Sequence, residues 1–438
     1  MAETDRLTRA IPWLFAPKRT GPGHLWPRWI FLRALGLLFL SVFYSLAFQI
    51  HGLIGTAGIL PAGGYLARIA HALPGLQRFW LAPTLLWLGA GHGALTALVV
   101  LGSASSALLV LGVWPRLTIF ASFVAFLSFI AAAQDFASYQ SDGMLLEASF
   151  LALFYAPPGV LPGLGERSPP SRASAFLLQW ECFRIYFESG VVKLASGDPS
   201  WRDMTAMDHY YENGPLPTWL GWYVQHWSHG FHAATSALTL IVELGVVWLF
   251  FFPRRWRLVC FAIITPLQVG IIATANYAFL NYLVLALGFL LLDDEALAPL
   301  FSSRRVQALR RRFRRKHDDE GTPDPVTVMW RLVAMSLVLS WVFYVTVADF
   351  LLTGAPEPLA WLLWPVRAVD PFRIANRYGL FAVMTPARYE IEFQGSSDGV
   401  TWTAYPFRYK PQALDAAPGI YAPYQPRFEW NLWFASLG

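Results

Sequence analysis

Long apolar runs separated by short polar stretches dominate this chain. A helix needs about 20 apolar residues to cross the hydrocarbon core of a bilayer, and most of the runs approach or exceed that length. The pattern predicts an all-α polytopic membrane bundle of about nine helices, at Trp29–Gln49, Thr84–Val113, Leu117–Ala133, Met144–Ala156, Ala173–Leu194, His232–Phe252, Leu258–Ala275, Tyr277–Leu292 and Val326–Phe350. The second run is interrupted by Gly89, Gly91 and Gly93, so we expect a short half-helix before it.

Basic residues concentrate in alternate loops, which predicts the orientation. Arg116, Arg167, Arg254 and the Arg304–Lys316 segment fall on the same side of the nine-helix pattern as the N-terminus. Cytoplasmic loops are enriched in Lys and Arg, so we expect the N-terminus inside and everything after Phe350 outside. The polar N-terminal segment leads into a first run of spanning length, which indicates an uncleaved signal anchor.

The last part of the chain has a different pattern. Tyr389–Gln394 alternates apolar and polar residues as a half-buried strand does. The turn sequence Ser396–Gly399 follows, and Val400–Tyr409 is interpreted as the returning strand of a hairpin. We therefore expect a transmembrane helical domain at 1–350, and an extracytoplasmic tail with a small β-element resting on the outer side of the membrane at 351–438.

The composition of the chain excludes several classes of protein. The chain is 55% hydrophobic and only 14% charged, whereas soluble domains are about 25% charged. The net charge of +5 arises mostly from loop residues, and Arg304–Lys316 is interpreted as a membrane-surface helix that contacts anionic lipid. We expect no nucleic-acid partner. The two cysteines exclude a disulfide framework.

Charged residues inside the apolar runs are the main candidates for chemistry, because charge is unfavourable within a membrane and often functional there. Glu181, Arg184 and Glu188 recur at i, i+3 and i+7, so they share one helix face. We expect them to face the bundle interior and to pair with each other or with Glu147 or Glu243. They form either a structural ion-pair stack or a site.

The segment after these charges offers further candidates. Lys193 is interpreted as a residue that reaches toward the interface or the acidic outer loop. Asp198–Asp203 is predicted to be an ordered turn, in which Trp201 anchors the membrane interface and Arg202 and Asp203 pair with each other or with Asp208.

Two sets of polar residues are interpreted as structural rather than catalytic. We interpret Asn276, Asn281 and Gln268 as interhelical contacts. The spacing of His226, His229 and His232 favours an amphipathic interfacial segment over a metal site, so we expect no metal and no cofactor.

Several long motifs resemble the lipase maturation factor family, and together they cover nearly the whole chain. The motifs are Gly52–Pro61, Phe183–Asp203, Asp208–Pro217, Asn276–Asn281 and Tyr424–Ala435. The resemblance implies a membrane protein of endoplasmic reticulum type that helps secreted lipases to fold, with a client polypeptide as partner and no catalysis.

This chain departs from the family pattern at its end. Family tails run on past Ala435, whereas this chain stops at Gly438, so we expect a trimmed or short variant without a retrieval signal. The Arg- and Ala-rich composition and the absence of an N-glycosylation sequon favour a bacterial cytoplasmic membrane. The endoplasmic reticulum membrane is the expectation for a eukaryotic source.

A second resemblance is to the membrane helices of vitamin K-dependent carboxylases, carried by Tyr139–Glu147 and Ser189–Leu194. It implies an alternative in which Lys193 acts as a base beside Glu188. Two hypotheses therefore remain, a membrane folding factor for exported proteins and an intramembrane enzyme. A folding factor would hold its client on exposed apolar surface at Pro215–Phe231 and Trp361–Pro371.

Overall fold

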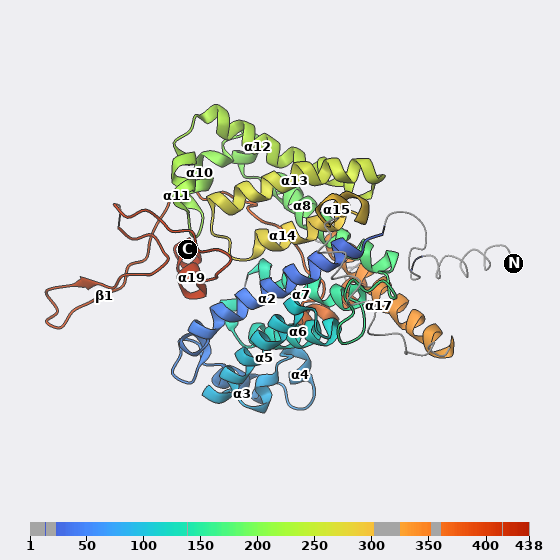
Figure 1. The fold of residues 1–438 in the computed structure, drawn as a ribbon. Helices are drawn as coiled ribbons and strands as arrows, with labels where there is room; N and C mark the ends of the chain where they lie inside the picture. The colour runs from blue at the N-terminus through green and yellow to red at the C-terminus, as the bar shows by residue number, and fades with distance from the viewer. Residues whose placement is uncertain are drawn as a thin grey trace.

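The computed structural model describes residue 14 and residues 23–137, 139–301, 325–351, 361–413 and 415–437. Helices that run roughly along one common direction form the body of the protein, and the last part of the chain covers one of its ends (Figure 1). The predicted basic helix Arg304–Lys316 lies outside the described residues, as do the basic residues that precede Arg28.

The first half of the chain forms one group of packed helices. α2 lies along α5, where Gly102 faces the ring of Phe43 so closely that a Cβ would be 2.1 Å from it. Small residues allow such close approach of apolar helices. The elements are α2 (Leu25–Ile54), α3 (Ala62–Ala72), α4 (Gln77–Leu81), η1 (Leu85–Leu88), α5 (His92–Leu111), α6 (Pro115–Ile130), η2 (Gln134–Ala137) and α7 (Gln140–Tyr155). The predicted half-helix before the second run is the 3-10 turn η1.

The second half packs α8 against α7 and α12, and α14 lies between the two groups of helices. The elements are α8 (Arg172–Ala195), α9 (Pro199–Arg202), α10 (Ala206–Asn213), α11 (Trp219–Gln225), α12 (His229–Leu244), η3 (Val246–Phe251), α13 (Arg254–Thr274), α14 (Leu280–Gly288), η4 (Phe289–Leu291), α15 (Asp294–Phe301) and α17 (Pro325–Leu351).

Five helical segments of the described chain have the length and apolar composition of membrane spans, which makes this an integral membrane protein. They are Leu25–Ile54, His92–Leu111, His229–Phe251, Arg254–Thr274 and Met329–Leu351. The other four predicted runs are helical as well, but α6, α7 and α14 are shorter and α8 carries several charges. A helix of 16 residues is only about 24 Å long, so the predicted count of nine spans is not confirmed.

Helix ends gather at two opposite ends of the bundle. At the first, which we call the basic end, Arg28 donates hydrogen bonds to the carbonyls of the 155–168 segment, Arg116 donates to Ala156, and Arg254 pairs with Asp293. These contacts join the starts of α2, α6 and α13 to the ends of α7 and α14. The opposite end, which we call the tail end, carries the strand β1 (Gln394–Gly395) and the helix α19 (Arg427–Ala435) (Figure 1).

The tail is less regular than predicted. It contains α18 (Trp364–Val369), η6 (Asp370–Phe372), β1 (Gln394–Gly395), β2 (Thr403–Ala404) and α19 (Arg427–Ala435). The predicted strands shrink to one antiparallel pair of two residues each, in which Gln394 lies opposite Ala404. Beyond this pair, side-chain contacts such as the ion pair of Glu390 with Lys410 join the two segments in place of a backbone ladder.

The predicted turn within the tail is present. Asp398 accepts the backbone N–H groups of Val400 and Thr401, and Gly399 has a φ of +71°, a left-handed conformation that glycine adopts readily. These hydrogen bonds hold the pKa of the exposed Asp398 carboxyl well below its usual range. The aromatic end of the chain forms the helix α19.

Candidate functional site

The buried charges of α7 and α8 form the centre of the molecule. α8 begins at an N-cap, where the Ser171 hydroxyl accepts the N–H of Ser174. Its 24 residues place Glu181, Arg184 and Glu188 on one face. Their exposed fractions are 0%, 2% and 4%, so the predicted burial of all three is observed.

Arg184 is the hub of this cluster. It forms an ion pair with Glu147 on α7, and its Nη1 lies 3.7 Å from Glu188 Oε1 one turn along α8. Removing one member of such a buried pair leaves the other charge without compensation, which destabilises a protein strongly. Pairing of Arg184 with Glu147 and Glu188 agrees with the expectation from the sequence.

Glu181 does not follow that expectation. In the described part of the chain, neither of its carboxylate oxygens has a hydrogen-bond partner. The reason is geometric, because Arg184 turns toward Glu147 and Glu188 and not toward Glu181. Glu181 therefore lies beside the ion pairs without joining them.

The cluster also binds a distant part of the chain. Arg184 Nη1 donates to the carbonyl of Asn376 at 2.7 Å, and the Asn376 N–H donates to Glu147 Oε2 at 2.9 Å. The Tyr378 N–H donates to Glu188 Oε2 at 2.7 Å, and its hydroxyl donates to Glu147 Oε2 at 2.8 Å. The charges on α7 and α8 thus form a seat for residues 376–378 of the tail.

Further contacts hold the residues that follow this seat. Trp201 donates its indole N–H to the carbonyl of Phe381, and Asn213 donates to the carbonyl of Thr385. We call residues 376–385 the docked segment. Arg184 lies 11 residues before the end of α8, so the docked segment enters the bundle about 16 Å below that end. Irregular backbone is tolerated at such depth only where protein surrounds it.

Lys193 is buried and does not reach toward the interface. Its Nζ lies 2.8 Å from both carboxylate oxygens of Glu243 on α12, and its side chain is only 3% exposed. The prediction that Lys193 reaches the outer acidic loop is therefore wrong. α12 packs against α8 and brings the carboxylate of Glu243 to Lys193 instead. This ion pair joins α8 to α12 through two residues that are 50 positions apart in sequence.

The predicted ordered turn at Asp198–Asp203 is present as the short helix α9. Asp198 caps it by accepting the Ser200 N–H at 2.8 Å, and its other oxygen accepts the Met384 N–H of the docked segment at 2.6 Å. Partial burial acts to raise the pKa of Asp198, but these two backbone N–H groups outweigh it and lower the pKa below its usual range. Asp198 therefore ties the turn to the tail as a carboxylate.

Two expectations within this turn are wrong. Trp201 is not an interface anchor, because it is 1% exposed and packs under Lys193 and the docked segment. Arg202 forms no ion pair with Asp203 among the described residues and donates instead to the carbonyl of Leu194 at 3.3 Å. Asp208, the other expected partner, pairs with His229 at 2.9 Å.

The polar residues of the later helices make interhelical contacts. Asn281 donates to Gln268 at 2.7 Å, and Gln268 donates to the Tyr186 hydroxyl at 2.8 Å, which links α14, α13 and α8. Asn276 donates to Gly419 and accepts from Tyr421, so it ties the helices to the tail. The sequence predicted that these residues make contacts between helices, but it did not predict the contacts of Asn276 with the tail.

The three histidines do not converge. His226 contacts the carbonyl of Trp222, His229 pairs with Asp208, and His232 is buried near the carbonyl of Gln225. Within the described ranges, no three His, Cys, Asp or Glu residues are arranged to hold a metal ion.

The sequence analysis missed a further buried ion pair, between α19 and α7. Arg427 of α19 is 1% exposed and donates to both oxygens of Asp142 on α7, at 2.7 and 2.8 Å. Arg427 lies in a motif of the lipase maturation factor resemblance and Asp142 in a motif of the carboxylase resemblance, and these two motifs were the available signal. Asn376 and Tyr378 offered no such signal, because they follow no helical or strand period.

The chain matches known families over most of its length. Residues 26–299 match the lipase maturation factor transmembrane domain, and residues 374–438 match the lipase maturation factor C-terminal domain. Lipase maturation factor 2 of Homo sapiens is 32% identical over 95% of this chain and 72% of the relative, and that of Gallus gallus is 31% identical over 94% and 70%. Lipase maturation factor 1 of Bos taurus is 30% identical over 96% and 77%. No solved structure matches.

Proposed function

The chain belongs to the lipase maturation factor family, and from this we propose that it holds an exported polypeptide of lipase type on its outer surface while that client folds. Its similarity to named lipase maturation factors supports the role of a membrane maturation factor. The client class and the surface that binds it are our proposals.

One observation carries the choice of surface. The tail projects its β1–β2 hairpin away from the helices (Figure 1), and the aromatic side chains Tyr389, Trp402 and Tyr405 of that region are 70%, 58% and 61% exposed. An exposed apolar patch on a projecting element is a feature of interaction sites. The buried contacts of Glu147, Arg184 and Arg427 hold the tail on the membrane bundle, so a client bound to the hairpin would stay next to the membrane.

Replacing Trp402 and Tyr405 by Ser tests this surface. We expect the yield of active lipase from cells that co-express an exported lipase to fall at least five-fold, because two exposed contacts for the unfolded client are lost. The protein itself should accumulate normally, since both side chains lie outside the core.

Trp256→Ser is the matched control, because Trp256 is 41% exposed at the basic end. Its lipase yield should equal that of the wild type. Equal loss in the control, or unchanged yield in the double variant, would contradict the assignment of the hairpin.

The alternative of an intramembrane enzyme needs Lys193 as a free base. Both oxygens of Glu243 contact its ammonium group, which supports a structural role in which the charge is retained. One cavity, at the basic end, has Phe176 and Asp293 in its lining. Another has His209 and Trp433 in its lining. Lys193 lines neither of these two cavities. We therefore propose the maturation factor without a cofactor.

We further propose nine passes with the basic end in the cytoplasm, and a division into a membrane domain at 1–350 and an outer tail at 351–438. The gathering of helix ends around Arg28, Arg116 and Arg254 supports this arrangement, because basic residues favour the cytoplasmic side. The bacterial cytoplasmic membrane remains our prediction from composition. The vertebrate relatives named above lend it no support.

A further inference from the structure

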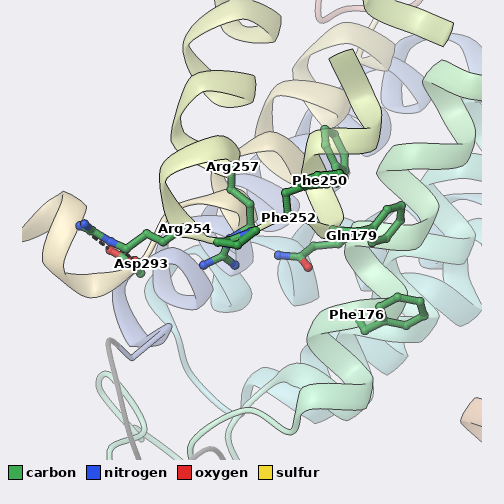
Figure 2. A pocket seen from close by; sticks show the side chains of 9 residues that line it. Phe176, Gln179, Phe250, Phe252, Arg254, Arg257 and Asp293 are labelled. Carbon is green, nitrogen blue, oxygen red and sulfur yellow. Dashed lines mark hydrogen bonds and ion pairs between the residues drawn. The ribbon is translucent and has the colours of Figure 1, made fainter. Parts of the chain in front are cut away.

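A cavity of about 550 Å³ lies at the basic end, between α8, η3 and the start of α13. Its volume is in the range of sites that hold small ligands. Phe176, Phe250 and Phe252 form an apolar wall, while Gln179 and Arg257 supply polar groups (Figure 2). None of the contacts that hold the tail involves this cavity.

Among the described residues that line this cavity, Arg257 is the cation without an ion pair. Its neighbour Arg254 turns toward Asp293, with Nε 2.6 Å from the carboxylate, and Asp293 also accepts the N–H of Ala296 at 2.9 Å. The Arg257 side chain makes no ion pair or hydrogen bond within the described part of the chain. Figure 2 shows its guanidinium group and the amide of Gln179 extending into the same space.

The start of α13 adds to the positive character of the cavity. This helix has 21 residues and begins directly after Pro253, and the backbone N–H groups of Arg254 and Arg255 have no acceptor among the described residues. The N-terminus of a helix carries a partial positive charge and free N–H donors, which together favour an anion.

The position of the cavity indicates what kind of anion it receives. α13 is one of the candidate membrane spans, so its first turn lies where the hydrocarbon core meets the headgroups. The turns of α13 that follow are apolar, so the acyl chains of a lipid bound here would lie in the hydrocarbon core. Basic pockets between spanning helices are suited to anionic headgroups.

We propose that this cavity binds an anionic phospholipid, with its phosphate at Arg257 and the start of α13 and its acyl chains in the adjoining hydrocarbon core. Arg254 pairs with Asp293 and also lies 3.6 Å from the exposed carboxylate of Glu295, which leaves Arg257, among the described lining residues, to meet the phosphate. The aromatic wall of Phe176 and Phe250 encloses the glycerol region.

Native mass spectrometry of the full chain tests this site. The purified protein is exchanged into detergent with dioleoylphosphatidylglycerol or dioleoylphosphatidylcholine at equal concentration. We expect one tightly held phosphatidylglycerol and at least five-fold less bound phosphatidylcholine. Arg257→Gln should lower the bound phosphatidylglycerol at least five-fold, whereas Arg255→Gln, which changes an exposed arginine over Trp256, should retain it.

Three outcomes would overturn the assignment. They are equal retention of the two lipids, equal loss in both variants, and unchanged retention in Arg257→Gln. A parallel sample with millimolar inorganic phosphate separates the possible sources of the anion. If phosphate alone displaces the lipid and is held with comparable affinity, the cavity is a site for free phosphate and the lipid assignment is wrong. Thermal unfolding of both variants shows that each remains folded.

Discussion

At the scale of single residues, Lys193 separates the two functional hypotheses. If Lys193 serves only as the cation that satisfies Glu243, Arg can replace it, because Arg keeps the charge and the reach. We expect Lys193→Arg to retain most of the lipase-maturation activity. An enzyme that uses Lys193 as a base would be inactivated by the same change, since Arg does not release its proton near neutral pH.

Lys193→Met completes this test, because it leaves Glu243 buried without a cation. We expect it to lower the free energy of unfolding by about 3–5 kcal/mol. Adding Glu243→Leu should recover most of that loss, since the unpaired charge is then gone. A folded, inactive Lys193→Arg variant would revive the enzyme hypothesis.

At the scale of elements, the docked segment depends on charges that belong to two other elements. Glu147→Gln weakens the ion pair with Arg184 and the hydrogen bonds to Asn376 and Tyr378. We expect it to lower the free energy of unfolding by about 3–5 kcal/mol. Limited proteolysis in membranes should then cleave the tail several-fold faster than in the wild type.

Glu181→Gln is the matched control for Glu147→Gln, because the same chemical change is made at an equally buried carboxyl that has no hydrogen-bond partner in the described chain. Its tail should be cleaved at the wild-type rate. If both variants release the tail equally, burial rather than the Arg184 network holds the segment, and the seat described above is wrong.

The elements also show what could be predicted from the sequence. The helices follow from apolar runs whose lengths are set by the membrane, so every predicted run is helical. The shared face of Glu181, Arg184 and Glu188 follows from helical periodicity. The partners do not follow, because Glu147 and Tyr378 are 231 residues apart and no local rule relates them. The strands were predicted too long, because only Gln394–Gly395 and Thr403–Ala404 pair, and beyond that pair Glu390 and Glu392 make side-chain contacts with Lys410 and Gln412.

At the scale of the whole molecule, the two ends should lie on opposite sides of the membrane. Cys182 and Cys260 are buried, so an introduced cysteine can be labelled against a low background. We expect Ser397→Cys in the tail to react with an impermeant thiol reagent in intact cells. Val160→Cys, exposed at the basic end, should react only after permeabilisation. Labelling of both before permeabilisation would contradict the proposed topology.

Photocrosslinking from the outer hairpin tests the central claim most directly. A benzoylphenylalanine side chain in place of Trp402 would sample whatever lies against the projecting hairpin in membranes of cells that export a lipase. We predict crosslinks to the newly exported lipase, greatly reduced when Glu147→Gln releases the tail. Crosslinks to lipid alone, or to the lipase with equal yield from position 256 at the basic end, would contradict the account.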